Sequence, residues 1–182
     1  MQACAHPCAH RHRRAQAGFT LVEIMIVVAL IGILAAVVVP SWIRESRKAK
    51  GDSEITAMFA EIATKQEQYK IDSGVYLSAS TCPSAPSSGG VDFNATCVTS
   101  GSAWASLRVS SPESKLRCTY AVTAGAAGAT LTPPTGFTVA NQPVGGWYYI
   151  LGVCDLDGQS GTNAMFFQSS TDTVIQKLNA GS

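Results

Sequence analysis

Glu23 is a lone carboxylate at the start of a long apolar stretch, and its position suggests a chemical role. Residues 24–39 carry no polar or charged side chain. As a helix, residues 19–39 would extend about 31 Å, close to the ~30 Å hydrocarbon core of a bilayer. A charged side chain at the centre of such a helix costs roughly 2.5–3.5 kcal/mol, and in apolar surroundings it needs a partner of opposite charge. We therefore expect Glu23 to be functional and to pair with a cation.

The residues that follow Cys154 suggest a metal site. Asp155, Asp157 and Gln159 alternate in a stretch rich in Gly and Ser, and their oxygens could bind Ca²⁺. The stretch lacks the closing glutamate of the twelve-residue calcium loop. Asp and Gly between two strands are also typical of a hairpin turn, which is the interpretation that we favour.

No side-chain pattern typical of catalysis is found in the sequence. All three histidines lie before residue 13, and there is no Gly-x-Ser-x-Gly motif, phosphate-binding loop or paired-carboxylate motif. Beyond residue 18, ten Lys and Arg stand against twelve Asp and Glu, which gives no general case for nucleic-acid binding. We expect a protein that is not an enzyme and that uses no cofactor, calcium excepted.

The residues around Gly18 resemble a known processing signal. A basic leader, residues 1–18, ends in Gly18 and is followed by Phe19-Thr20-Leu21-Val22-Glu23 and the apolar run. This order, with Gly, then Phe, then a Glu five residues into the mature chain, resembles the type III signal of type IV prepilins and pseudopilins. An ordinary secretory signal has a shorter apolar region, which is removed on cleavage.

The resemblance implies a series of events at this segment. A prepilin peptidase and N-methyltransferase of the inner membrane would cut between Gly18 and Phe19 and methylate the new Phe19 amine. The apolar run would stay on the mature protein as its anchor and assembly helix. Glu23 of one subunit would neutralise the Phe19 amine of another and so fix the register of assembly. Pairing of Glu23 with its own Phe19 amine, one helical turn away, is the alternative.

The resemblance also implies a topology, which the charges alone do not decide. Arginines precede the apolar run, and a basic cluster follows it, so the positive-inside rule leaves the orientation open. The cluster consists of Arg44, Arg47, Lys48 and Lys50. It could contact lipid headgroups or an acidic neighbouring subunit, or simply be solvated. A prepilin spans the inner membrane once, with its N-terminus in the cytoplasm, and later lies in a pilus fibre on the cell surface or in the periplasm.

Residues 19–72 are predicted to form one helix with two different halves. Gly32 and Pro40 are expected to kink or unwind it, because proline removes a helical hydrogen bond and clashes with the preceding turn. Residues 40–72 are amphipathic. The apolar face comprises Ile55, Met58, Phe59, Ile62, Ala63, Gln66 and Tyr69. The opposite, charged face is assigned Glu54, Glu61, Lys65, Glu67 and Lys70. Gly74 is expected to end the helix in a left-handed conformation.

The rest of the chain is predicted to add a loop region and an antiparallel sheet. Residues 73–103 are rich in Ser, Gly, Pro and Thr and are expected to form a long loop. Residues 104–182 contain the strand signals, with β-branched and aromatic residues in alternating patterns. These signals cover residues 116–122, 136–140, 147–154, 164–168 and 174–178, and residues 104–109 are expected to form an opening strand or a turn. The predicted fold is α+β, a long N-terminal helix packed on an antiparallel sheet of about four strands.

Four cysteines beyond the export signal suggest two disulfides and an oxidising compartment. They are Cys82, Cys97, Cys118 and Cys154. Three pairings exist, and proximity along the chain favours Cys82 with Cys97 and Cys118 with Cys154.

Together these features predict a major or minor structural subunit of a type IV pilus. A pseudopilin of a type II secretion system is one alternative. A minor pilin whose loop at residues 77–103 binds DNA or a surface is another. Partners would be other pilins, the prepilin peptidase, the inner membrane and its assembly platform.

Overall fold

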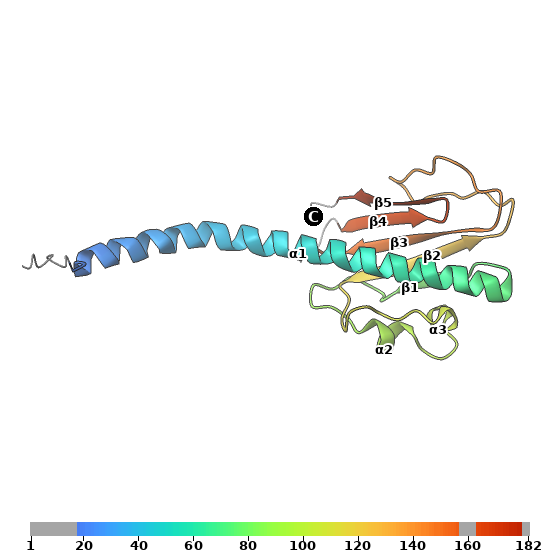
Figure 1. The fold of residues 1–182 in the computed structure, drawn as a ribbon, viewed down its shortest axis with the longest axis horizontal. Coiled ribbons are helices and arrows are strands. Elements are labelled where there is room, and N and C mark those ends of the chain that lie inside the picture. The colour runs from blue at the N-terminus through green and yellow to red at the C-terminus, as the bar shows by residue number, and fades with distance from the viewer. Residues whose placement is uncertain (1–17, 157–162, 180–182) are drawn as a thin grey trace, which may run out of the picture. The chain divides into compact units, whose positions relative to one another are not determined.

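The computed structural model describes residues 18–156 and 163–179. In this part of the chain a long helix, α1 (Leu21–Ser73), precedes a sheet and two short helices, α2 (Phe93–Cys97) and α3 (Ala103–Leu107) (Figure 1). The strands are β1 (Ala79–Cys82), β2 (Cys118–Gly125), β3 (Trp147–Cys154), β4 (Ala164–Ser169) and β5 (Asp172–Leu178). The chain divides at Pro40 into two compact units.

The described strands form one antiparallel sheet in sequence order, β1-β2-β3-β4-β5. β2 and β3 pair over their whole length, from Cys118 opposite Cys154 to Gly125 opposite Trp147. The predicted α+β fold is confirmed, with five strands in place of about four. The additional strand is β1, which lies within the segment predicted to be a loop and pairs with β2. Helix α2 also lies in that segment.

Two local predictions differ from the structure. Residues 136–140 form no strand. Instead, the Gln176 side chain accepts a hydrogen bond from the Thr138 N–H at 3.1 Å and donates one to the Thr138 carbonyl at 2.7 Å. One side chain thus satisfies the backbone groups that a neighbouring strand would have bound. Residues 104–109, expected to form a strand or turn, contribute to α3, which is capped by the Ser102 hydroxyl accepting from the Ala105 N–H.

The second half of α1 packs its apolar face on the sheet. Ile55, Phe59 and Ile62 on this face are buried, as predicted. Gly152 in β3 lies beneath them, and a Cβ added there would be 2.5 Å from Ile55 Cδ1 and 3.1 Å from Phe59 Cε1. The helix therefore approaches the sheet as closely as it does because this position has no side chain. Gly74 ends the helix with φ +82°, as predicted.

The other face of the sheet is covered by residues between β2 and β3. Leu131 and Phe137 from this connection form a second buried cluster with Trp147 and Phe167. The Trp147 indole N–H donates to the Ala129 carbonyl at 2.7 Å, which ties the connection to β3. Successive strand residues face opposite sides, so β3 contributes to both buried clusters.

Two disulfides join the four cysteines in the pairing that proximity favours. Cys82 bonds to Cys97, and this links β1 to α2. Cys118 bonds to Cys154, and these residues also face each other across β2 and β3.

Candidate functional site

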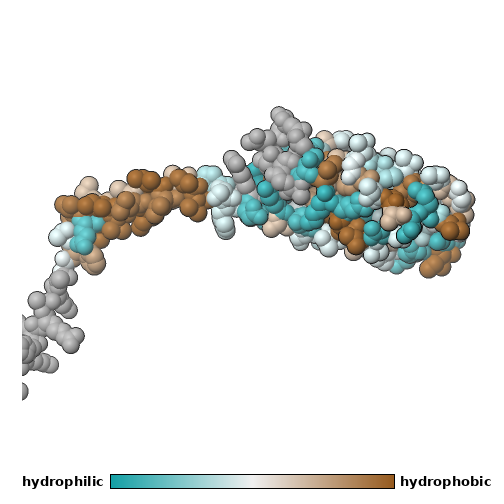
Figure 2. Space-filling view, turned by 90° about the horizontal axis from the view of Figure 1, so that it is seen from above, coloured by the Kyte–Doolittle hydropathy of each residue, from teal (hydrophilic) through white to brown (hydrophobic). Residues whose placement is uncertain are grey.

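The first candidate site is the apolar surface of residues 18–43. Every residue in this stretch is exposed, and Phe19 keeps 78% of its accessible surface. Figure 2 shows the resulting apolar covering on the N-terminal part of α1. Among the described residues, α1 is the helix that is long and apolar enough to cross a membrane. A contiguous apolar surface of this kind marks contact with lipid or with another protein.

Glu23 lies in the first turn of this helix. Its backbone N–H donates to the Thr20 Oγ1 at 3.2 Å, and the Ile24 N–H donates to the Thr20 carbonyl at 3.3 Å. Thr20 therefore caps the helix, and the Thr20-x-x-Glu23 spacing is that of a capping box. Within residues 18–156 and 163–179, no hydrogen bond or ion pair reaches the Glu23 carboxylate. Its charge is exposed and complements the helix N-terminus.

A second carboxylate of α1, that of Glu54, is buried and hydrogen-bonded. Glu54 is 1% exposed, and its Oε1 accepts hydrogen bonds from the Cys118 N–H at 2.9 Å and the Tyr120 hydroxyl at 2.9 Å. The Arg117 N–H lies 3.0 Å from Oε1 and 2.8 Å from Oε2. These four residues, Glu54, Arg117, Cys118 and Tyr120, are called the Glu54 clamp below. The clamp fastens α1 to the start of β2.

The assignment of Glu54 to the charged, outward face of the helix was therefore wrong. Burial without a hydrogen bond would be costly for a carboxylate, but the donors at the start of β2 compensate for it. Burial and the neighbouring Glu54 carboxylate in turn raise the pKa of Tyr120 far above its usual value, which keeps the hydroxyl protonated as a donor.

Comparison with known proteins bears on the first of these sites. Residues 13–39 match the family model for the prokaryotic N-terminal methylation motif. The chain is 44% identical over 61 residues to the type IV wide pilus major component PilA4 of Thermus thermophilus, which covers 34% of this chain and 46% of that protein. The N-terminal segment is similar to that of type IV pilins and pseudopilins.

Two further relatives share the same kind of match. The chain is 41% identical over 63 residues to the type II secretion system core protein G of Vibrio cholerae, covering 35% of this chain and 42% of that protein. It is 44% identical over 52 residues to the type IV major pilin protein PilA of Myxococcus xanthus, covering 29% of this chain and 23% of that protein. The chain thus spans less than half the length of each of these relatives. No solved structure matches it significantly.

The residues predicted to be processed lie at the start of the described part of this pilin-like segment. Gly18 and Phe19 are exposed and precede the first helical turn. Gly32 and Pro40 both lie inside α1, which is assigned as helix through each of them. Their expected part in kinking or unwinding the helix stays a prediction.

The basic cluster and the calcium candidates remain predictions as well. Arg47 and Lys50 are exposed, Lys48 is half-buried, and all lie with Arg44 in α1. Asp155 is described, whereas Asp157 and Gln159 lie outside the described residues. Within the described ranges, no three His, Cys, Asp or Glu side chains are grouped as metal ligands.

Proposed function

We propose that this chain is a structural subunit of a type IV pilus, made as a precursor and polymerised through the first half of α1. The observation that carries the proposal is the methylation motif at residues 13–39, which overlaps the fully exposed apolar surface of residues 18–43. A membrane would cover this surface before assembly, and neighbouring subunits would cover it afterwards. No catalytic role is assigned to any residue.

Glu23 supplies the specificity of assembly in this proposal. Cleavage after Gly18 creates a cationic amine at Phe19, and methylation leaves its charge in place. In an apolar fibre core, an incoming subunit in the wrong register would leave both this amine and a Glu23 carboxylate unpaired, at a large desolvation cost. The exposed carboxylate, for which the described residues supply no partner, supports an intermolecular pair.

The proposal also places the chain in the cell. The leader lies in the cytoplasm, residues 19–39 cross the inner membrane, and the sheet-containing part lies in the periplasm until assembly moves it to the surface. Two disulfides in the sheet-containing part support the oxidising side of the membrane. The prepilin peptidase, the assembly platform and other pilins are the partners.

Mass spectrometry of the chain and of sheared fibres tests the proposal. We expect the mature chain to begin at N-methylated Phe19 and to be abundant in fibres sheared from intact cells. Gly18→Leu should accumulate the uncut precursor in the membrane fraction. A mature chain that starts elsewhere would refute the processing site, and fibres without this chain would exclude a major pilin.

A pseudopilin of a type II secretion system is the second candidate, because relatives from several bacteria are named as core protein G of that system. A deletion strain separates the two functions. Loss of surface fibres with normal export of secreted enzymes supports the pilus. Loss of that export, in cells that never carried surface fibres, supports the pseudopilus.

A further inference from the structure

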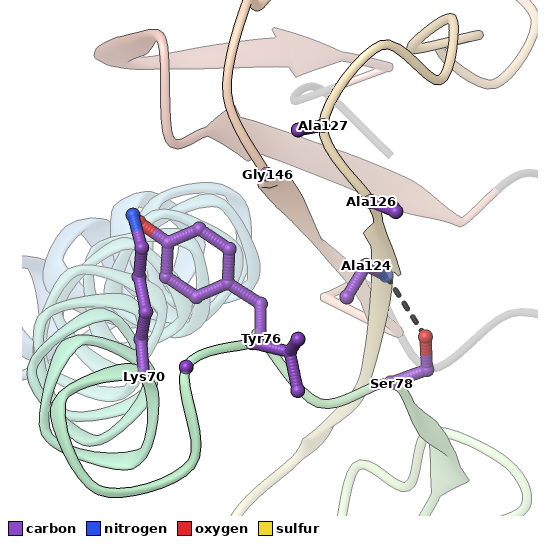
Figure 3. Close-up of a pocket in the computed structure, with 10 residues that line it drawn as sticks. Lys70, Tyr76, Ser78, Ala124, Ala126, Ala127 and Gly146 are labelled. Carbon is purple, nitrogen blue, oxygen red and sulfur yellow. Dashed lines mark hydrogen bonds between the residues drawn. The ribbon is translucent and has the colours of Figure 1, made fainter.

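A cavity of about 400 Å³ lies beside the C-terminal end of α1, within the sheet-containing unit (Figure 3). Three separate segments form its walls: the end of α1 with the turn that follows, the end of β2 with residues 126–127, and Gly146 before β3. Its size is within the ~300–1,000 Å³ that small-molecule sites occupy.

The walls of the cavity are made mostly of small residues. Ala124, Ala126, Ala127 and Gly146 leave the space open on one side, and the Tyr76 ring borders the other. The Tyr76 ring packs edge-on against Tyr148, with ring centroids 4.8 Å apart, so it is held in place. This surface suits an apolar group, and the cavity has room for one of at least the size of a leucine side chain.

Lys70 adds a positive charge to an otherwise uncharged lining. Its ammonium donates to the Tyr76 hydroxyl at 3.0 Å, and that hydroxyl donates to Glu67 Oε1 at 2.8 Å. The hydrogen bond to Tyr76 raises the pKa of Lys70, so the ammonium is charged at neutral pH. An ammonium has three donors, of which one is used by the hydrogen bond to Tyr76. The remaining donors can bind an anion, although Glu67 nearby offsets part of the charge.

We propose that this cavity binds a carboxylate that carries an apolar body. The apolar body would lie between the Tyr76 ring and the alanine methyl groups. The carboxylate would extend past the edge of that ring to accept hydrogen bonds from Lys70, whose ammonium lies 4.4 Å from the ring centroid. This chemistry is found in the C-terminal residue of a polypeptide and in a free branched-chain acid. The proposal does not depend on filament assembly.

Titration of the mature full-length chain in zwitterionic detergent micelles tests the proposal. With ¹³C-labelled alanine methyl groups, the probes are 4-methylpentanoate, the peptide acetyl-Gly-Gly-Leu with a free carboxylate, and the same peptide as its amide. We expect both acids to shift the methyl signals of Ala124, Ala126 and Ala127, and the amide to bind at least about tenfold more weakly. The acid that binds more tightly identifies the source. Equal binding of the acid and amide peptides, or no shift with millimolar acid, would overturn the proposal.

A pair of glycine variants controls for unspecific binding. A Cβ added at Gly146 would lie 3.5 Å from the Gly125 carbonyl oxygen and 3.9 Å from Tyr76 Cδ2, which are ordinary contacts. Gly146→Val should therefore place a side chain against the Tyr76 ring without straining the backbone. Gly145 is outside the lining, and a Cβ there meets no atom within 4 Å. We expect Gly146→Val to abolish the shifts and Gly145→Val to preserve them. Wild-type affinity in Gly146→Val would reject the site.

Lys70→Gln tests the charge separately, and it keeps the proposal testable should Gly146→Val fail to fold. The variant should weaken binding of the acid peptide about tenfold and bring it level with the amide peptide. An unchanged preference for the acid peptide would show that Lys70 does not hold the carboxylate.

Discussion

The two halves of α1 each place a carboxylate in a setting that is costly for a charge, but they resolve it differently. Glu54 is buried against the sheet and receives its donors from β2 and the residue before it. Glu23 is exposed in an apolar stretch, and the described residues offer its carboxylate no partner. The Glu54 carboxylate thus accepts its hydrogen bonds within the chain. The Glu23 carboxylate, under the proposed function, is available to pair with a second subunit. In the proposed assembly, the Glu23 carboxylate lies on the surface that acts between molecules.

The largest effect is expected from removing Glu23. Glu23→Ala should be cleaved and methylated normally, but should abolish fibre formation, because the Phe19 amine of each incoming subunit would stay unpaired in an apolar core. Immunoblots of sheared fibres, with mass spectrometry of the membrane-bound chain, measure the two outcomes. Glu45→Ala removes another exposed carboxylate of α1 and is the matched control, which should leave fibres unchanged. A normal fibre yield in Glu23→Ala would contradict the proposed difference between Glu54 and Glu23, since Glu23 would then have no intermolecular role.

Removing Glu54 should affect folding of the subunit itself. Glu54→Ala leaves two backbone N–H groups and the Tyr120 hydroxyl without an acceptor, at roughly 1–3 kcal/mol for each buried group. The free energy of unfolding should therefore fall by at least about 3 kcal/mol. Glu61→Ala is the control, because Glu61 accepts an exposed hydrogen bond from the Ser110 N–H and pairs with Lys65 at 3.9 Å, and its loss should cost about 1 kcal/mol. Denaturant unfolding followed by tryptophan fluorescence measures both, and equal losses would show that the Glu54 clamp adds no more stability than the contact of Glu61.

High pH should weaken the clamp through Tyr120. The pKa of this residue is raised in the folded state, so above the unfolded value of about 10 the unfolded chain releases a proton that the folded chain retains. The stability contribution is complete below pH 10 and falls by about 1.4 kcal/mol for each further pH unit. Tyr148 has a raised pKa as well, because of burial, and adds to the same trend. Between about pH 8 and 11, the free energy of unfolding should fall less steeply with pH in Tyr120→Phe than in the unsubstituted chain. An identical pH dependence in the two would contradict the assignment of this effect to Tyr120.

The smallest effect is expected at Thr20, which separates helix capping from charge pairing at Glu23. Thr20→Ala removes the hydroxyl that accepts from the Glu23 N–H and should reduce the stability of the first turn by about 1 kcal/mol. Fibre yield should fall slightly, and Thr20→Ser should restore it. A loss of fibres as complete as that in Glu23→Ala would mean that Glu23 acts in assembly through the shape of the helix start.

The sequence predicted those parts of the fold that depend on local pattern. The apolar spacing of Ile55, Phe59 and Ile62 identified the buried helix face, and Gly74 identified the end of α1. The aromatic and β-branched residues of 147–154 identified β3 with its observed bounds. In each case neighbouring residues along the chain contain the information, because period and backbone conformation are local properties.

The errors involve partners that are distant in the sequence. Glu54 was placed outside because it is charged, and its donor at Arg117 lies 63 residues away. Residues 136–140 form no strand, and the backbone groups of Thr138 instead bind the side chain of Gln176, which is 38 residues away. Strand β1 has four residues and no extended alternating pattern, and it is identified only through its pairing with β2. The cavity beside Lys70 likewise joins three segments that no local pattern connects.

The disulfide between Cys118 and Cys154 has a mechanical consequence for a subunit under load. In the proposed fibre, tension would act along the covalent chain of a subunit once that subunit begins to unravel. The bond bridges a sequence separation of 36 residues, which includes β2, β3 and the connection that holds the second buried cluster. Stretched out, that segment would add about 120 Å of length at the ~3.4 Å that an extended residue spans. While the bond is intact, tension in the proposed fibre would bypass this segment, and a subunit that began to unravel would not release that length into the fibre.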